Sequence, residues 1–264
     1  MKRNLLAEIY WRNPLLTLVG WLHVVLLIGT LAGLLTDDRI VMGVNAWLEP
    51  TKFMLSIAIF LWTIAWFSKY LRKPRWLLTT VSIVLSVTMI AESACILLQA
   101  ARGITSHYDV ATDFDAAIFQ TMRIMIGIDM VVVVVILFML SKPGVRLHPG
   151  YLWAIRAGIV IFLAGGLIGG VMLGNGAHTF GAPDGGPGLP LLNWSTVDGD
   201  LRIAHGLALH ALQILPLIGF GLSRWSAVPR PATKLVLLTL AVLAYSATVV
   251  LLYLRAVAGI AVPG

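Results

Sequence analysis

Seven long apolar runs follow one another along the chain, separated by short segments that carry most of its charge. A helix of about 20 apolar residues is long enough to cross a bilayer, and backbone groups in lipid must be paired within the segment, so these runs predict transmembrane helices. We expect an all-α polytopic membrane protein, a single seven-helix bundle over residues 1–264. The expected spans are residues 15–35, 51–70, 77–101, 114–140, 152–174, 201–222 and 234–256.

Composition and charge refine this picture. The chain is 59% hydrophobic and 12% charged, whereas soluble domains are roughly 45–50% apolar. The net charge of +7 does not indicate a nucleic-acid partner, because the basic residues cluster before the first span and in alternate connections. Nine of the twelve acids fall in the opposite connections. The positive-inside rule then predicts a cytoplasmic N-terminus, retained as the first span, and a C-terminus on the other side.

The outer connections are longer than the cytoplasmic ones, and the longest covers residues 174–200. It is rich in Gly and Pro and also contains His178 and Asp184. Such a segment needs special turns and is long enough to fold over the bundle as a lid. We expect Trp47 and Trp194 to lie in the interfacial aromatic belt.

Three spans carry an ionisable residue at a similar depth. At 1.5 Å per residue, His23 lies roughly 18 Å from the outer end of its span, and Glu92 and His210 each lie roughly 14 Å from theirs. Buried ionisable groups are costly in a membrane and usually face a cavity or one another. The three residues therefore predict an intramembrane cavity open to the outer side.

Helical spacing adds further residues to this cavity. Glu92, Gln99 and Arg102 form one stripe, and His210 shares a face with Gln213. His205 is turned about 140° from His210 and groups instead with Arg202. The expected cavity lining comprises Lys52, Gln99, His178, Asp184, His205 and Gln213.

Each polar residue also has a purely structural interpretation. A histidine in a membrane helix is often an interhelical hydrogen-bonding residue, and Glu92 can be a neutral acid bonded to a neighbour such as Ser93. Asp129 in the fourth span can pair with another helix or reach toward Arg156. The glycines of the fifth span suit either close helix packing or a flat cofactor.

Three kinds of chemistry fit the cavity. His23, Glu92 and His210 can hold zinc or a similar transition metal, with Glu92 and His210 as catalytic residues in hydrolysis. Alternatively, His23 and His210 can be axial ligands of a b-type haem, whose propionates would meet Arg102 and Arg202. Either cofactor would serve enzymatic or redox chemistry on a small or lipid-derived molecule. The third alternative uses no cofactor: the acids and histidines relay protons in a small-molecule transporter.

The segments WLEPTKFMLSIAIFLWTIAW, AESACILLQAARGITSHYDVAT and AHTFGAPDGGPGLPLLNWSTVDGDLRIAHGLALHALQILP resemble a group of uncharacterised bacterial multi-pass membrane proteins. The resemblance extends over most of the chain and implies a bacterial inner-membrane location, with the C-terminus in the periplasm. The seven spans with buried His and acid also resemble alkaline ceramidases and progestin-receptor-like membrane hydrolases. Those carry an HxxxH pair in a late span, whereas this chain has HGLALH.

Overall fold

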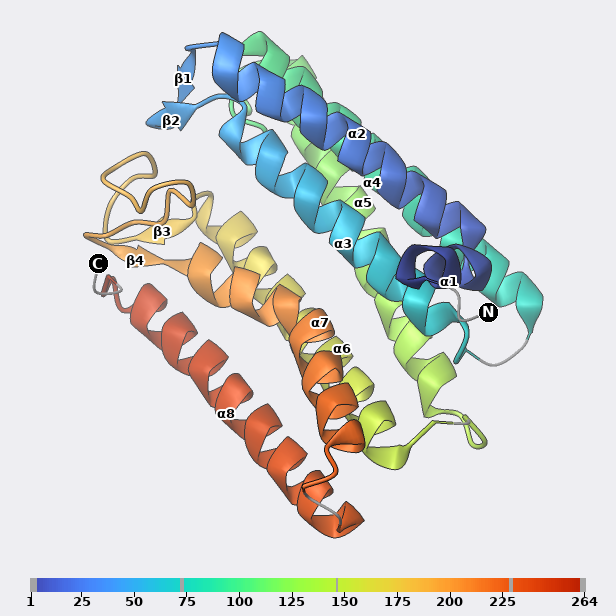
Figure 1. Ribbon diagram of the computed structural model, residues 1–264. Helices are drawn as coiled ribbons and strands as arrows, with labels where there is room; N and C mark the ends of the chain where they lie inside the picture. Colours follow the sequence, from blue (N-terminus) through green and yellow to red (C-terminus); the bar gives the residue numbers. More distant parts are fainter. Residues whose placement is uncertain (1–3, 72–73, 146, 228–229, 262–264) are drawn as a thin grey trace. The chain divides into compact units, whose positions relative to one another are not determined.

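The computed structural model describes residues 4–71, 74–145, 147–227 and 230–261. Within these residues the chain forms eight helices and four two-residue strands (Figure 1). The helices are α1 (Leu5–Arg12), α2 (Pro14–Thr36), α3 (Leu48–Ser68), α4 (Arg75–Arg102), α5 (Asp113–Ser141), α6 (Pro149–Asn175), α7 (Leu201–Arg224) and α8 (Pro231–Val257). The strands are β1 (Ile40–Val41), β2 (Val44–Asn45), β3 (Thr179–Phe180) and β4 (Gly199–Asp200).

The helices α2 to α8 are each long and apolar enough to cross a membrane, which confirms the seven predicted spans. Every predicted end lies within three residues of the observed one. Three helices begin with a proline at their first position, Pro14, Pro149 and Pro231, because proline fixes a helical φ and needs no hydrogen-bond acceptor there. The short helix α1 and the strands were not predicted.

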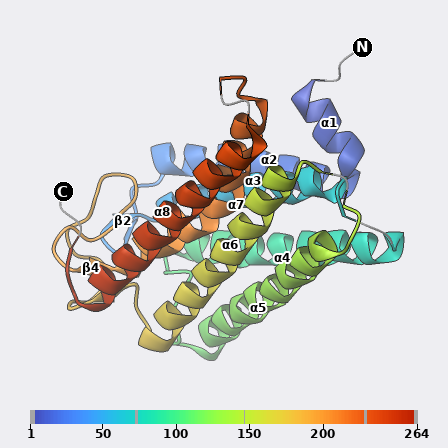
Figure 2. The same ribbon diagram turned by 90° about the horizontal axis from the view of Figure 1, so that it is seen from below.

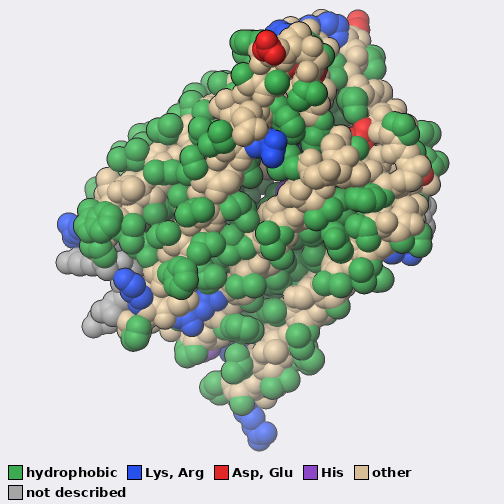
Figure 3. Space-filling model, turned by 180° about the vertical axis from the view of Figure 1, so that it is seen from behind, with side chains coloured by type: hydrophobic (Ala, Val, Ile, Leu, Met, Phe, Trp, Pro, Cys, Tyr) green, Lys and Arg blue, Asp and Glu red, His purple; other side chains and the backbone are tan. Residues whose placement is uncertain are grey.

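Exposed apolar side chains cover much of the molecular surface, as Figure 3 shows for one face. They include Leu167 and Phe138, each more than half exposed. A water-soluble protein rarely exposes apolar patches of this extent, so these side chains are placed to contact lipid.

The contacts between residues divide the chain into two compact units, residues 1–132 and 133–264. The first contains α1 to α4, the β1–β2 hairpin and the start of α5. In it α2 packs along α3, and glycines make this approach possible. A Cβ atom on Gly20 would lie 2.3 Å from the Trp62 ring, and one on Gly33 would lie 2.5 Å from the Trp47 ring.

The second unit contains the end of α5 and the helices α6, α7 and α8. Its α6 and α7 pack most closely, along small residues. A Cβ atom on Gly158 would lie 2.6 Å from Ala211 O, and one on Gly165 would lie 2.9 Å from Ala208 Cβ. These glycines therefore allow two helices to approach each other, as small residues commonly do in membranes.

Residues 176–200 fold at the end of the second unit where α8 finishes (Figure 2). Strand β3 pairs with β4 in antiparallel register, Thr179 opposite Asp200. A Cβ atom on Gly199 would lie 2.0 Å from Ala256 O, so this strand lies directly against the backbone of α8. The long connection is an ordered cap on its own unit.

Candidate functional site

Buried polar side chains gather in the first unit, and α4 contributes six of them. Helical spacing divides the six between two faces. Ser82, Ser86 and Ser93 lie on the face that meets α2, and Thr88, Glu92 and Gln99 lie on the face that meets α5. The two faces have different chemistry.

His23 of α2 is fully buried, and both of its ring nitrogens have partners. Nδ1 lies 2.7 Å from Val19 O, and Nε2 lies 2.8 Å from Ser93 Oγ. A neutral ring with its proton on Nδ1 donates to the carbonyl and accepts from the Ser93 hydroxyl. His23 thus forms the interhelical hydrogen bond expected of a structural membrane histidine, and a metal would have to replace one of these contacts.

The end of the first unit where α3 finishes and α4 begins, which we call the Asn13 end, has a second network of this kind. Asn13 donates to Ser68 Oγ at 3.1 Å and to Ser82 Oγ at 2.7 Å. Its Oδ1 also accepts from the Leu16 amide at 3.1 Å and caps α2. A single side chain therefore joins three helices.

The other face of α4 carries two buried acids whose oxygens are only partly used. Glu92 is 1% exposed and Asp129, on α5, is 5% exposed. Among the described residues, neither Glu92 Oε2 nor Asp129 Oδ2 has a hydrogen-bond partner. Such incompletely bonded buried acids are uncommon in membrane helices.

Thr88 connects Asp129 to α4. Its Oγ1 lies 2.5 Å from Asp129 Oδ1 and 2.9 Å from the carbonyl of Val84, one turn earlier. A hydroxyl has one hydrogen to donate. If that hydrogen goes to Val84 O, the hydrogen between Thr88 and Asp129 belongs to the carboxyl group.

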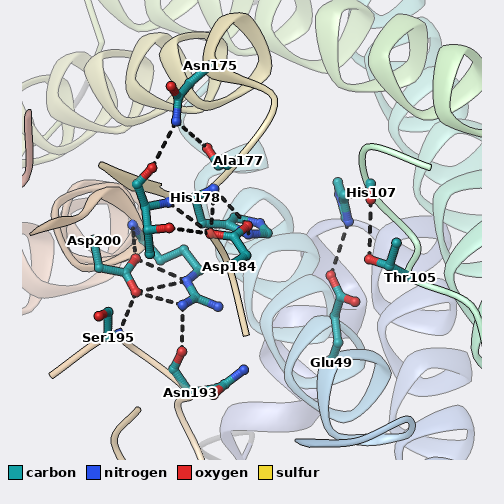
Figure 4. Close-up of polar contacts among 12 residues, drawn as sticks. Glu49, Thr105, His107, Asn175, Ala177, His178, Asp184, Asn193, Ser195 and Asp200 are labelled. Atoms are coloured by element: carbon teal, nitrogen blue, oxygen red, sulfur yellow. Dashed lines mark hydrogen bonds and ion pairs between the residues drawn. The ribbon is translucent and has the colours of Figure 1, made fainter. Parts of the chain in front are cut away.

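His107, in the segment that joins α4 to α5, lies at the end of the first unit opposite to the Asn13 end, and we call it the His107 end. Its Nδ1 lies 3.1 Å from Glu49 Oε1 (Figure 4) and 2.7 Å from Ser106 Oγ. Its ring stacks on Phe53, with 5.6 Å between centroids. Burial lowers the pKa of His107, but the hydrogen bond to Glu49 and the charges of Glu49 and Glu92 outweigh burial and raise it above its usual value.

Gln99 and Arg102, two members of the predicted stripe, meet at Asp115 of α5. Gln99 Nε2 donates to Asp115 Oδ1 at 2.9 Å, and Arg102 donates to the same oxygen. Thr112 donates to the other oxygen at 2.5 Å. Arg102 is therefore held by a buried acid that was not among the predicted site residues.

A further acid at the His107 end was also missed. Asp37 accepts hydrogen bonds from Arg39 and from Trp47 Nε1, the latter at 2.8 Å. Arg39 also donates to the carbonyl of Ala101 at 2.8 Å. The hydrogen bonds from Arg39, then that from Trp47, hold the pKa of Asp37 well below its usual range. This cluster fastens the β1–β2 hairpin to the end of α4.

In the second unit, His178 and Asp184 form a clamp inside the 176–200 segment (Figure 4). Asp184 Oδ2 lies 2.6 Å from His178 Nδ1, and the carboxylate accepts from the amides of His178 and Thr179 and from the Thr179 hydroxyl. Burial raises the pKa of Asp184. The hydrogen bonds from His178 and Thr179 and the charge of His178 lower it by more, so the pKa lies far below its usual range. These predicted cavity residues thus organise a loop.

Arg202 has a comparable role with Asp200, a 3% exposed acid that was not predicted. Asp200 accepts from the Arg202 guanidinium and from the amides of Ser195 and Arg202. Arg202 Nη2 also donates to Asn193 O at 2.5 Å. The guanidinium is therefore engaged within the loop.

The histidines of α7 lie on different faces, as their spacing predicts. His205 Nδ1 lies 2.8 Å from Gly165 O on α6, whereas the side chain of His210 is exposed. Gln213 is half-buried on α7, and Lys52 is half-buried near the start of α3. His210 belongs to the second unit, so a site shared with His23 and Glu92 stays a prediction.

Arg156 of α6 donates to Leu140 O at 2.6 Å, while Asp129 contacts Thr88 instead. Within either unit, the described His, Cys, Asp and Glu side chains form no group of three that could hold a metal ion. The zinc-like site and the haem both stay predictions.

Comparison with known proteins finds no matching protein family, no matching curated protein and no matching solved structure. The residues themselves therefore carry the functional argument.

Proposed function

We propose that the chain is a cofactor-free membrane protein that moves protons, in support of small-molecule transport. Protons would pass from Glu49 and His107 to Glu92 and Asp129. One observation carries this proposal: Glu92 and Asp129 are both buried in the first unit, and each has a carboxyl oxygen with no hydrogen-bond partner among the described residues.

The first step is entry at the His107 end. The side chains of Glu49 and His107 are 32% and 18% exposed, so water reaches both. Histidine changes its charge near neutral pH, and the Glu49 contact keeps His107 protonated to a higher pH than usual. The pair thus concentrates protons above Glu92.

The second step is transfer into the membrane. An ionised carboxylate is costly in a medium that does not solvate it, so Glu92 and Asp129, both buried and incompletely hydrogen-bonded, favour holding a proton. Thr88 supports this state, because its hydroxyl can accept from a protonated Asp129 while donating to Val84 O. Asp129 lies sixteen residues into α5, roughly 24 Å along its axis.

The third step continues toward the Asn13 end. Below Thr88, the buried Ser86 Oγ has no hydrogen-bond partner among the described residues. One turn further, Ser82 joins the Asn13 network. Ser86 and Ser82 lie on the α2 face of α4, so a proton that leaves the acids would cross from the α5 face of this helix to reach the Asn13 network.

The distribution of charge supports an orientation for this path. The basic residues Lys69 and Arg75 border the Asn13 end, and the acids Asp37, Glu49 and Asp109 border the His107 end. We propose that the N-terminus is cytoplasmic, the C-terminus periplasmic and the membrane the bacterial inner membrane, so the path opens outward.

The experiment is proton flux into liposomes that contain the purified protein and an internal pH dye, driven by a potassium diffusion potential. The wild type should acidify the interior faster than empty vesicles, and Glu92→Gln should remove about nine tenths of the protein-dependent rate, since it deletes the central carrier. Asp113→Asn is the matched control, because Asp113 is an exposed acid on α5. Full flux in Glu92→Gln, or no flux in the wild type, would contradict the proposal.

A further inference from the structure

The second unit contains a cavity of about 240 Å³ at the end where α6 and α8 begin and α7 finishes. Its lining includes His148, Gly150, Leu222, Ser223, Lys234 and Leu238. None of the described residues that line it is acidic. The cavity is therefore positive at its polar rim and apolar elsewhere.

Lys234 is the main charged group of the cavity. Its Nζ donates to Ser223 O at 3.1 Å, which holds the side chain across the gap between α8 and α7. An ammonium group carries three hydrogens, so this bond leaves others for a ligand. Arg224, the last residue of α7, and Arg230, the residue before α8, add positive charge at the two ends of the connection between these helices.

The helix ends add to the positive electrostatic potential of the cavity. The helices α6 and α8 begin beside the cavity, at Pro149 and Pro231, and neither has a side-chain cap. Backbone N–H groups at such ends remain free to bind an anion, and the helix dipole favours negative charge there. His148, which precedes α6, is exposed at the same place.

The inner wall of the cavity is apolar. Leu222 of α7 and Leu235 and Leu238 of α8 provide it. Gly150 keeps the space open, because a Cβ atom there would point toward His148 and Leu238 at ordinary contact distances of 3.5 and 3.9 Å. A cationic rim over an apolar wall suits an amphiphile with an anionic head.

We propose that this cavity binds the headgroup of an anionic phospholipid from the surrounding membrane. The phosphodiester would contact Lys234 and His148, and the glycerol backbone would lie along Leu235 and Leu238. Charge complementarity favours this occupant, since Lys234 lines the cavity, Arg224 and Arg230 flank the connection beside it, and anionic lipid attracts basic residues at the membrane surface. The site is independent of the proton path.

Native mass spectrometry of the full chain tests this proposal, with phosphatidylglycerol and phosphatidylcholine offered in equal amounts. The wild type should retain phosphatidylglycerol preferentially. Lys234→Gln should reduce this preference about fivefold, the effect of one basic residue near a membrane surface. Lys142→Gln is the matched control, because Lys142 is an exposed lysine before α6 that does not line the cavity.

A second variant tests the cavity rather than the charge. Gly150→Leu should fill the space and abolish phosphatidylglycerol retention, while seven-helix folding, checked by circular dichroism, is kept. Glycerol 1-phosphate should compete weakly, because it lacks the apolar part; competition as strong as that of the lipid would overturn the assignment to lipid. Equal losses in Lys234→Gln and Lys142→Gln, or equal retention of the two lipids by the wild type, would overturn the site.

Discussion

The two units bring membrane helices together by different means. In the first, polar side chains cross between helices: His23 meets Ser93, Asn13 meets Ser82, and Thr88 meets Asp129. In the second, small residues let α6 and α7 touch, and the buried polar side chains gather in the 176–200 segment. Close packing needs no ionisable group, so the acids inside the first unit call for a functional explanation.

The acids of the two units also differ in how completely their carboxyl oxygens are hydrogen-bonded. Asp184 and Asp200 each accept several hydrogen bonds and hold a loop in shape. Glu92 and Asp129 each leave a buried oxygen without a partner. Fully bonded acids stabilise structure, whereas partly bonded ones remain able to take up and release protons.

The largest expected effect is on a fully bonded acid of the second unit. Asp200→Ala should destabilise the folded state by about 3 kcal/mol, because it leaves the partly buried Arg202 and two backbone amides without their acceptor. Limited proteolysis of residues 176–200 measures it, with Asp198→Ala, a half-buried acid of the same segment, as control. Equal resistance of both variants would remove the distinction between the two kinds of acid.

A smaller effect tests helix packing in the second unit. Gly158→Ala should cost about 2 kcal/mol, since the added methyl would lie 2.6 Å from Ala211 O and the backbone cannot yield cheaply. Gly170→Ala should be harmless, because a Cβ atom there has nothing within 4 Å. Thermal unfolding in detergent compares them, and equal midpoints would show that close α6–α7 packing does not matter.

At the His107 end of the first unit, the prediction concerns pH. The pKa of His107 is raised in the fold, so the stability that its bond to Glu49 contributes is present at low pH and is lost as pH rises through that raised pKa. Glu49→Gln should lower the pKa of His107, because it removes the negative charge that offsets the lowering effect of burial. NMR titration of the imidazole measures this pKa, and an unchanged value would show that Glu49 does not control proton entry at the His107 end.

The smallest stability effect is expected at Glu92. Glu92→Gln should change the free energy of unfolding by less than about 1 kcal/mol, because the carboxyl oxygen that it replaces has no partner to lose. The same unfolding assay measures it. A loss as large as that of Asp200→Ala would make Glu92 a structural acid and place it with those of the second unit.

Hydrophobic periodicity was sufficient to predict all seven spans, since each must supply about 20 apolar residues to cross lipid. The observed starts at Pro149 and Pro231 came earlier than predicted because proline begins a helix before its apolar stretch does. The strands escaped prediction because a two-residue pairing leaves no alternation to detect.

Counting residues from the outer end of the third span identified Glu92 as a deeply buried acid. The same count along the fourth span would have identified Asp129. Its contact with Thr88 could not be predicted, because it depends on the rotation of α5 against α4. His107 lies in an outer connection, and its partner Glu49 is 58 residues away in the chain. Such pairings depend on tertiary packing, which the pattern of residues along one chain does not reveal.

The most direct test of the proton path is infrared spectroscopy of the protein in vesicles, following the carbonyl stretch of protonated carboxyl groups as the outer pH is varied. We predict a buried carboxyl band that responds to outer pH and shifts on deuteration. It should be lost or altered in both Glu92→Gln and Asp129→Asn but not in Asp113→Asn. A spectrum with no such band, or a band unaffected by either buried substitution, would contradict the account.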